Sequence, residues 1–227
     1  MRGEGAWIDL SRPLSEATPV WPGDVPWSLS WTMRIEEGAS VNVTALSGSA
    51  HAGTHAESAL HVRAGDAPLE AVPLDAFVGA AEILDVAAPP GGPTVPTVGV
   101  DEVEERIAPD TERLLLRTGC DWSEGFPTRF RALSEPLARW CVERGLRLVG
   151  TDAPSIDPYD SERLAAHRIV TGAGIAVLES LALARARPGR YELIALPLPI
   201  DGAEASPVRA VARPISSRTE SDGSVPR

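Results

Sequence analysis

Three of the four histidines in this chain fall within eleven residues, and this cluster constrains the local fold more than any other feature of the sequence. They are His51, His55 and His61, and Glu57 lies among them. A helix turns about 100° per residue, so it would spread the three imidazoles and the carboxylate over roughly 160° of its circumference. All four side chains can converge only if the segment leaves helical geometry, and Gly53 permits such a turn.

The residue types in this cluster are those of a metal site. Imidazole nitrogens together with a carboxylate oxygen are the ligand set of catalytic Zn²⁺, Mn²⁺ and Fe²⁺ centres. Three protein ligands and one open position describe a metal that activates water. The spacing matches none of the common zinc signatures such as H-E-x-x-H. The alternative is a group of surface or core histidines without a metal, but the clustering favours the metal site.

Two further residues are candidates on chemical grounds. His167 lies in a segment that we expect to be helical, and Glu179 ends the apolar run 175–178. Burying an unpaired charge is costly, so a carboxylate at the end of a buried strand needs a partner. A cation and an arginine both satisfy that need, and the spacing alone does not distinguish them.

The rest of the chain predicts one α/β domain, because short apolar strands alternate with helical segments. Prolines in the first thirty residues exclude a long helix there, and 21–24 is typical of a turn that fixes the Trp21 indole. Ser134 and Pro136 predict the start of a helix that Gly145 ends. Strands are predicted at 41–45, 81–86, 114–116, 146–149, 175–178 and 193–198, a short acidic helix at 101–107, and a loop at 88–96.

Composition excludes several classes of function. The net charge of −11 argues against nucleic acid as a partner, since phosphate contacts come from clustered basic residues. Lysine is absent, which removes Schiff-base and P-loop chemistry. No G-x-S-x-G elbow occurs. No apolar run approaches the about 20 residues that span a bilayer, and no secretory signal is visible. We therefore expect a cytoplasmic protein with no membrane partner.

The segment from His51 to His61 resembles the motif H-x-G-[TA]-H-x-D-x-P-x-H of the metal-dependent cyclase family. Within that family the chain is most similar to the bacterial kynurenine formamidase branch. The resemblance covers about Ile8 to Pro214. Further stretches that carry it are 20–24, 66–69, 72–75, 150–157, 166–167, 178–179, 191–198 and 205–210.

The resemblance implies a single compact swivelling β/β/α-type domain over 1–215. The tail over 216–227 is polar and contains Gly, Ser and Pro, so we expect it to be disordered. It also implies a homodimer or larger homo-oligomer and two divalent ions per chain, zinc in most members, with manganese as an alternative. One ion would be bound by His51, His55 and Glu57. Glu57 and Glu179 would bridge to the second ion, which His167 also holds.

The resemblance further implies that His61 is the general acid/base and that Trp21 lines the substrate pocket. Two positions depart from the family motif: Glu57 stands where the family has Asp, and Ala59 stands where it has Pro. Glutamate is longer by one methylene, and alanine loosens a backbone angle that proline would fix. We expect the longer carboxylate to serve as a ligand in the same place.

The implied reaction is the hydrolysis of N-formyl-L-kynurenine to L-kynurenine and formate, in tryptophan degradation, by an arylformamidase. A related hydrolase acting on a cyclic amide such as isatin is one alternative. A member of the family that binds a metal or ligand without catalysis is another. A structural protein with a scavenged surface ion is disfavoured, because all four histidines occupy motif positions.

Overall fold

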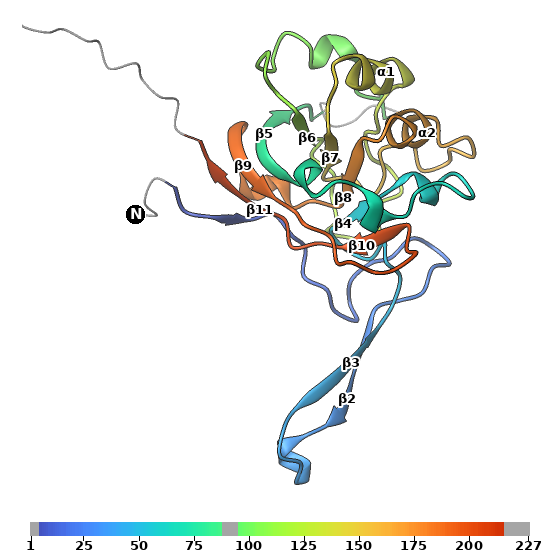
Figure 1. Ribbon diagram of the computed structural model, residues 1–227, viewed down its shortest axis with the longest axis vertical. Coiled ribbons are helices and arrows are strands. Elements are labelled where there is room, and N and C mark those ends of the chain that lie inside the picture. Colours follow the sequence, from blue (N-terminus) through green and yellow to red (C-terminus); the bar gives the residue numbers. More distant parts are fainter. Residues whose placement is uncertain (1–4, 88–94, 216–227) are drawn as a thin grey trace, which may run out of the picture.

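A curled nine-stranded sheet organises the protein (Figure 1), as described by a computed structural model over residues 5–87 and 95–215. Within these residues the strand order is β1-β11-β9-β5-β6-β7-β8-β4-β10. The strands are β1 (Ile8–Asp9), β4 (His55–Glu57), β5 (Val78–Asp85), β6 (Arg113–Arg117), β7 (Leu148–Thr151), β8 (Ala176–Glu179), β9 (Gly189–Ile194), β10 (Ala205–Pro207) and β11 (Val211–Pro214). The tail 216–227 and most of the loop expected at 88–96 lie outside the described residues.

The centre of the sheet is parallel and its flanks are antiparallel. Strands β5, β6, β7 and β8 pair in parallel, whereas β4 and β10 on one side and β9, β11 and β1 on the other pair antiparallel. Parallel strands are usually buried on both faces and therefore apolar throughout. In β6, Leu115 packs into one core cluster, and Leu114 and Leu116 pack into the other. Both faces of the sheet are thus covered.

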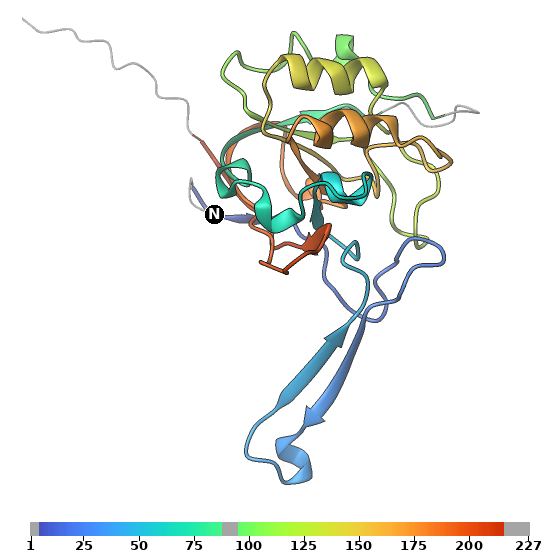
Figure 2. The same cartoon turned by 45° about the vertical axis from the view of Figure 1, so that its right-hand side comes forward.

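Two helices, α1 (Glu135–Glu143) and α2 (Ala165–Gly172), lie against the same face of the sheet (Figure 2). Helix α1 begins as its sequence predicts, because the Ser134 hydroxyl accepts a hydrogen bond from Leu137 N–H at 3.2 Å. Buried Leu137 and Cys141 form its apolar side. Among the described residues, no helix is long and apolar enough to cross a membrane.

Several predicted elements differ from the structure in type or in bounds. The helix at 101–107 is wrong: only a 3₁₀ turn over Val100–Glu102 forms, and the Glu102 carboxylate instead accepts hydrogen bonds from Gly99 N–H and the Arg131 guanidinium. The strand predicted at 193–198 is β9, which ends at Ile194. The strand predicted at 146–149 is β7, which begins at Leu148 and continues through Gly150 to Thr151, since a glycine there lets the Leu115 side chain approach closely.

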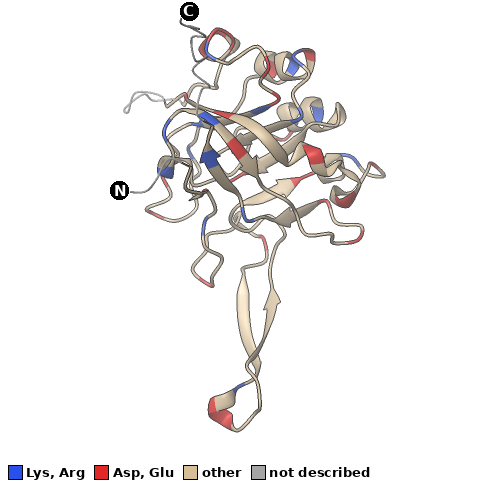
Figure 3. Cartoon of the chain, turned by 60° about the vertical axis from the view of Figure 1, so that its left-hand side comes forward, with Lys and Arg blue, Asp and Glu red and all other residues tan. Residues whose placement is uncertain are grey.

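A two-stranded hairpin of β2 (Ser28–Met33) and β3 (Val43–Ser47) projects away from the sheet (Figure 1). The strand predicted at 41–45 is therefore real but begins and ends two residues later. Every residue in both strands is exposed. Figure 3 shows no charged residue along the two strands and acidic residues at the tip, where Glu36 and Glu37 follow Arg34.

Candidate metal centre

Strand β4 presents two candidate ligands on one face of the sheet. Gly53 adopts φ +64°, a left-handed conformation that turns the chain from His51 into the strand. His55 and Glu57 are two residues apart in β4, so their side chains point to the same face. In the neighbouring strand β8, Glu179 pairs directly opposite His55. The turn and the register therefore bring residues from two distant segments together.

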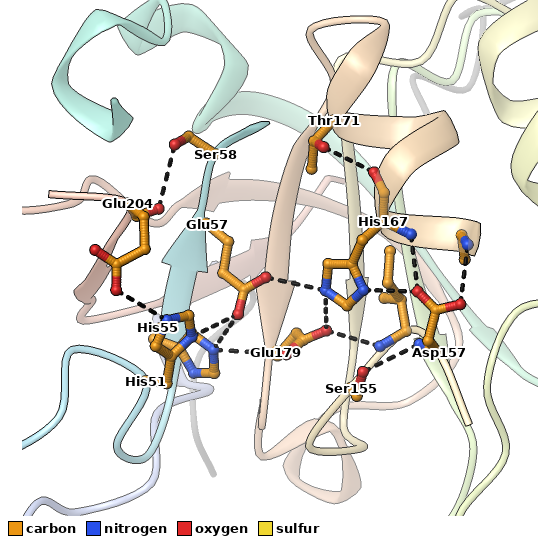
Figure 4. Close-up of polar contacts among 12 residues, drawn as sticks. His51, His55, Glu57, Ser58, Ser155, Asp157, His167, Thr171, Glu179 and Glu204 are labelled. Atoms are coloured by element: carbon orange, nitrogen blue, oxygen red, sulfur yellow. Dashed lines mark hydrogen bonds and ion pairs between the residues drawn. The ribbon is translucent and has the colours of Figure 1, made fainter. Parts of the chain in front are cut away.

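Glu57 lies at the centre of the cluster (Figure 4). Its Oε1 is 2.7 Å from His51 Nδ1 and 2.9 Å from His55 Nε2. Its Oε2 is 3.0 Å from Nε2 of His167, which helix α2 contributes. One carboxylate thus contacts three imidazoles.

Glu179 lies on the other side of the same imidazoles. Its carboxylate oxygens are 3.2 Å from His167 Nε2 and 3.5 Å from His55 Nε2, and one of them accepts a hydrogen bond from Ile156 N–H at 2.7 Å. Both glutamates are almost completely buried. Among the described residues, Glu179 forms ion pairs with His55 and His167 and with no arginine, so the arginine partner that the sequence allowed is not found.

Each of the three imidazoles has an acceptor for its outer nitrogen. His55 Nδ1 lies 2.9 Å from the Gly53 carbonyl oxygen, and His51 Nε2 lies 3.2 Å from Glu204 Oε1. His167 Nδ1 lies 2.7 Å from Asp157 Oδ2. Outer partners of this kind fix the tautomer and the ring orientation of metal-binding histidines. The inner nitrogens, Nδ1 of His51 and Nε2 of the other two, face the glutamates.

The buried carboxylates of the cluster need positive charge close to them. Burial by itself would lower the pKa of His51, but the Glu57 and Glu204 carboxylates raise it to about 10. Burial opposes ionisation of His55 too, yet Glu179 and Glu57 raise its pKa to about 9. Burial alone would raise the pKa of Glu57, but His51 and His167 hold it well below its usual value. Two buried carboxylates with neutral imidazoles would lack compensation, and divalent cations can supply it.

The donor set fits divalent ions. Ligand atoms lie within 4.8 Å of one another in two groups, one of His51, Glu57 and His61 and the other of His55, Glu57 and Glu179. Glu57 belongs to both groups, so its longer side chain reaches between the two sets of candidate ligand atoms. Ala59 begins a 3₁₀ turn over Ala59–His61, which directs His61 back toward His51.

His61 lies at the edge of the cluster, in the group that it forms with His51 and Glu57. Its ring centroid is 4.5 Å from that of His51 and 5.6 Å from that of His167. Burial lowers the pKa of His61 and outweighs the nearby carboxylates, so its imidazole is neutral near pH 7. A neutral imidazole next to a metal centre can accept a proton from water and return it elsewhere.

A cavity of about 390 Å³ opens onto the cluster. Trp21 lines it, as expected, and its ring stacks on Tyr159 at 5.0 Å and meets the edge of Phe126 at 5.3 Å. The turn at 21–24 forms as predicted: Asp24 N–H donates to the Trp21 carbonyl oxygen at 2.9 Å. Residues lining the cavity are Trp21, Asp24, His51, His55, Glu57, His61, Phe126, Pro154, Ser155, Ser161, Leu164 and Glu179.

The structure thus brings together all seven residues singled out from the sequence. Sequence reasoning missed Asp157, Glu204 and Phe126. Asp157 lies in the stretch 150–157 that carries the family resemblance, so its position was a usable signal. Nothing in the local sequence marks Glu204 or Phe126, because each acts through contacts with residues more than 100 positions away.

An α/β domain with a buried histidine–carboxylate cluster below an aromatic cavity is typical of a metal-dependent hydrolase. Comparison with known proteins identifies the family. The model of the Cyclase family matches residues 8–158. Kynurenine formamidase of Salinibacter ruber is 42% identical over 211 residues, covering 92% of this chain and 97% of that protein. Kynurenine formamidase of Bacillus cereus is 40% identical over 210 residues, covering 92% and 98%.

Solved structures share the fold. Isatin hydrolase A from Labrenzia aggregata bound to benzyl benzoate has a TM-score of 0.79 at 23% identity and covers 92% of this chain and 94% of its own. A potential metal-dependent hydrolase with cyclase activity has a TM-score of 0.79 at 24% identity and covers 94% and 100%. The chain belongs to the Cyclase family. The predicted α/β class and single compact domain are confirmed.

Proposed function

We propose that this protein is a metal-dependent arylformamidase that hydrolyses N-formyl-L-kynurenine to L-kynurenine and formate. The observation that carries the proposal is the convergence of Glu57 and Glu179 with three imidazoles at the base of an aromatic cavity. Identity of about 40% to kynurenine formamidases, over nearly the whole chain, supports the substrate.

We assign the metal ligands as His51, His55, Glu57, His167 and Glu179, holding two divalent ions, zinc by preference and manganese as the alternative. When bound, such ions supply Lewis acidity that polarises the formyl carbonyl group and acidifies water. The outer acceptors on Gly53, Asp157 and Glu204 keep the imidazoles oriented for this task.

His61 is the proton carrier in this proposal. Neutral and next to the cluster, it accepts a proton as water attacks the formyl carbon. It then donates that proton to the aniline nitrogen as the C–N bond breaks, so that formate and the amine leave. General acid–base catalysis of this kind contributes about 10²- to 10⁴-fold in rate. Trp21 provides a face on which the aryl ring can stack.

The first test is a spectrophotometric assay with N-formyl-L-kynurenine, with and without a chelator. We expect turnover that the chelator abolishes and added Zn²⁺ restores. Elemental analysis should find divalent metal in the purified protein. Absence of bound metal, or turnover that persists after its removal, would contradict the proposal.

The second test is the His61→Ala variant, which should retain its metal and lose about 10²-fold or more in turnover. Metal analysis of the same sample provides the control, because a collapsed centre would lose metal as well. Normal turnover in this variant would show that His61 does not carry the proton.

Hydrolysis of a cyclic amide is the second candidate function, favoured by the fold likeness to isatin hydrolase. Ring opening of isatin needs the same attack on an amide carbon. Assays of isatin and N-formyl-L-kynurenine side by side separate the two, and we expect the formamide to be the better substrate. A non-catalytic member of the family would bind metal and hydrolyse neither compound.

The proposal includes a homodimer that acts in the cytoplasm in tryptophan degradation. The hairpin supports an assembly, because an isolated two-stranded ribbon is marginally stable in water and this one exposes large apolar side chains. These are Leu29, Trp31, Met33, Ile35, Val41, Val43 and Leu46. Sedimentation equilibrium tests it: Leu46→Glu should shift the protein toward monomer, and Ser30→Glu, an exposed position on the opposite face of the hairpin, serves as the comparison.

A further inference from the structure

One acidic side chain lines the cavity outside the metal cluster. The cavity wall includes three carboxylates, and among its described residues none is arginine. Glu57 and Glu179 contact the imidazoles. Asp24 instead belongs to the turn beside Trp21, where its N–H donates to the Trp21 carbonyl oxygen. It therefore gives the outer wall a negative charge that the metal centre does not use.

The turn holds Asp24 in a defined place. Its N–H donates to the Trp21 carbonyl oxygen at 2.9 Å, and its Oδ1 accepts a hydrogen bond from Val25 N–H at 2.7 Å. The Trp21 ring in turn packs on Tyr159 and Phe126. Asp24 is partly buried, which limits competition from water. Since the turn uses Oδ1, a ligand in the cavity can approach Oδ2.

The proposed substrate carries two opposite charges at the end remote from the formyl group, an α-ammonium and an α-carboxylate. A cavity that recognised the carboxylate would need a cationic donor in its wall, and the arginine fork is the usual one. The wall instead offers the Asp24 carboxylate. This group attracts the substrate's ammonium and repels the substrate's carboxylate. The aryl ring on Trp21 would place the amino-acid side chain on the same side as Asp24.

We propose that Asp24 binds the α-ammonium group of the substrate, so that the enzyme selects aryl formamides that carry a cationic amine. This inference rests on the proposed function and deepens it. The substrate's carboxylate then points out of the cavity toward water. Asp24 is a specificity-determining residue in this account, and the cleavage step remains with the metal centre and His61.

The test compares two substrates in two variants. Asn keeps an acceptor for Val25 N–H and removes the charge, so Asp24→Asn should leave the turn intact. For N-formyl-L-kynurenine we expect this variant to raise KM about tenfold with little change in kcat, in the range of a partly desolvated ion pair. For the same aryl formamide with hydrogen in place of the α-amino group, KM should change less than about twofold in the variant.

Asp160→Asn is the matched control, because Asp160 is exposed beside Tyr159 and does not line the cavity. It should leave both substrates unaffected. If Asp24→Asn raises KM equally for both substrates, or for neither, Asp24 has no role in binding the ammonium. The inference is then overturned while the proposed function stands. If the wild-type metal-loaded enzyme cleaves neither formamide, the proposed function fails and the inference fails with it.

Discussion

Replacing Asp157 with asparagine tests whether the outer carboxylates position the metal-binding histidines. Asp157 accepts three hydrogen bonds: from Ala166 N–H at 2.9 Å, from His167 N–H at 2.9 Å and from His167 Nδ1 at 2.7 Å. It therefore orients the imidazole and caps the first turn of α2 at once. Asparagine has a single acceptor oxygen, so it can serve the two His167 donors but turns its NH₂ group toward Ala166 N–H.

The expected magnitude follows from these contacts. A hydrogen bond to a charged group contributes about 1.5–3 kcal/mol and a neutral one about 0.5–1.5 kcal/mol. Losing the charge and one acceptor should thus cost about 1.5–3 kcal/mol in the orientation of His167 and the first turn of α2. A free-energy loss of about 1.4 kcal/mol corresponds to a tenfold loss of affinity. We therefore expect the ion held by His167 and Glu179 to bind about 10- to 100-fold more weakly.

The assay is a competition titration with a chromogenic chelator, which reports metal affinity without reference to catalysis. Denaturant unfolding of the metal-free variant is measured in parallel, because the lost helix cap should lower stability by about 1 kcal/mol. Asp110→Asn is the control, since Asp110 forms an exposed ion pair with Arg190. A folded Asp157→Asn protein whose metal affinities stay within twofold of wild type would refute the reasoning.

Three other changes have expected outcomes. Glu57→Asp, which restores the family residue, should keep both activity and bound metal, and loss of metal on analysis would show that the longer side chain is required here. Gly150→Ala should destabilise the protein by about 1–3 kcal/mol in denaturant melts. The reason is that the new Cβ would lie 2.5 Å from Leu115 Cδ2 and 3.0 Å from Leu181 Cδ1. An unchanged unfolding midpoint would mean that the core relaxes freely around the added methyl group. The Arg131 guanidinium lowers the pKa of Glu102 from its ordinary value of 4.5, so this carboxylate stabilises the fold above that pH and the effect is lost as the pH falls through the lowered pKa. In melts between about pH 5 and 2, the stability of Glu102→Gln should fall less with pH than that of the wild type. Identical stability profiles of the two proteins would contradict the Glu102–Arg131 contribution.

Local sequence signals predicted the elements that depend on neighbouring residues. The Ser134 cap, the glycine-permitted turn at Gly53 and the turn at 21–24 all act over a few positions, and each occurs as expected. The helix expected at 101–107 was wrong because Glu102 is drawn into a contact with Arg131, 29 residues away, that no local pattern encodes.

The sequence by itself determined the chemistry of the site: clustered imidazoles with a carboxylate, and no lysine, arginine-rich patch or serine elbow to support another mechanism. Only the tertiary structure decided how the donors meet. Strand pairing sets Glu179 opposite His55, and packing of α2 on the sheet brings His167 to Glu57 across 110 residues. Register and packing are properties of the whole sheet, so they also decide which outer acceptor each imidazole finds and where Asp24 faces the cavity.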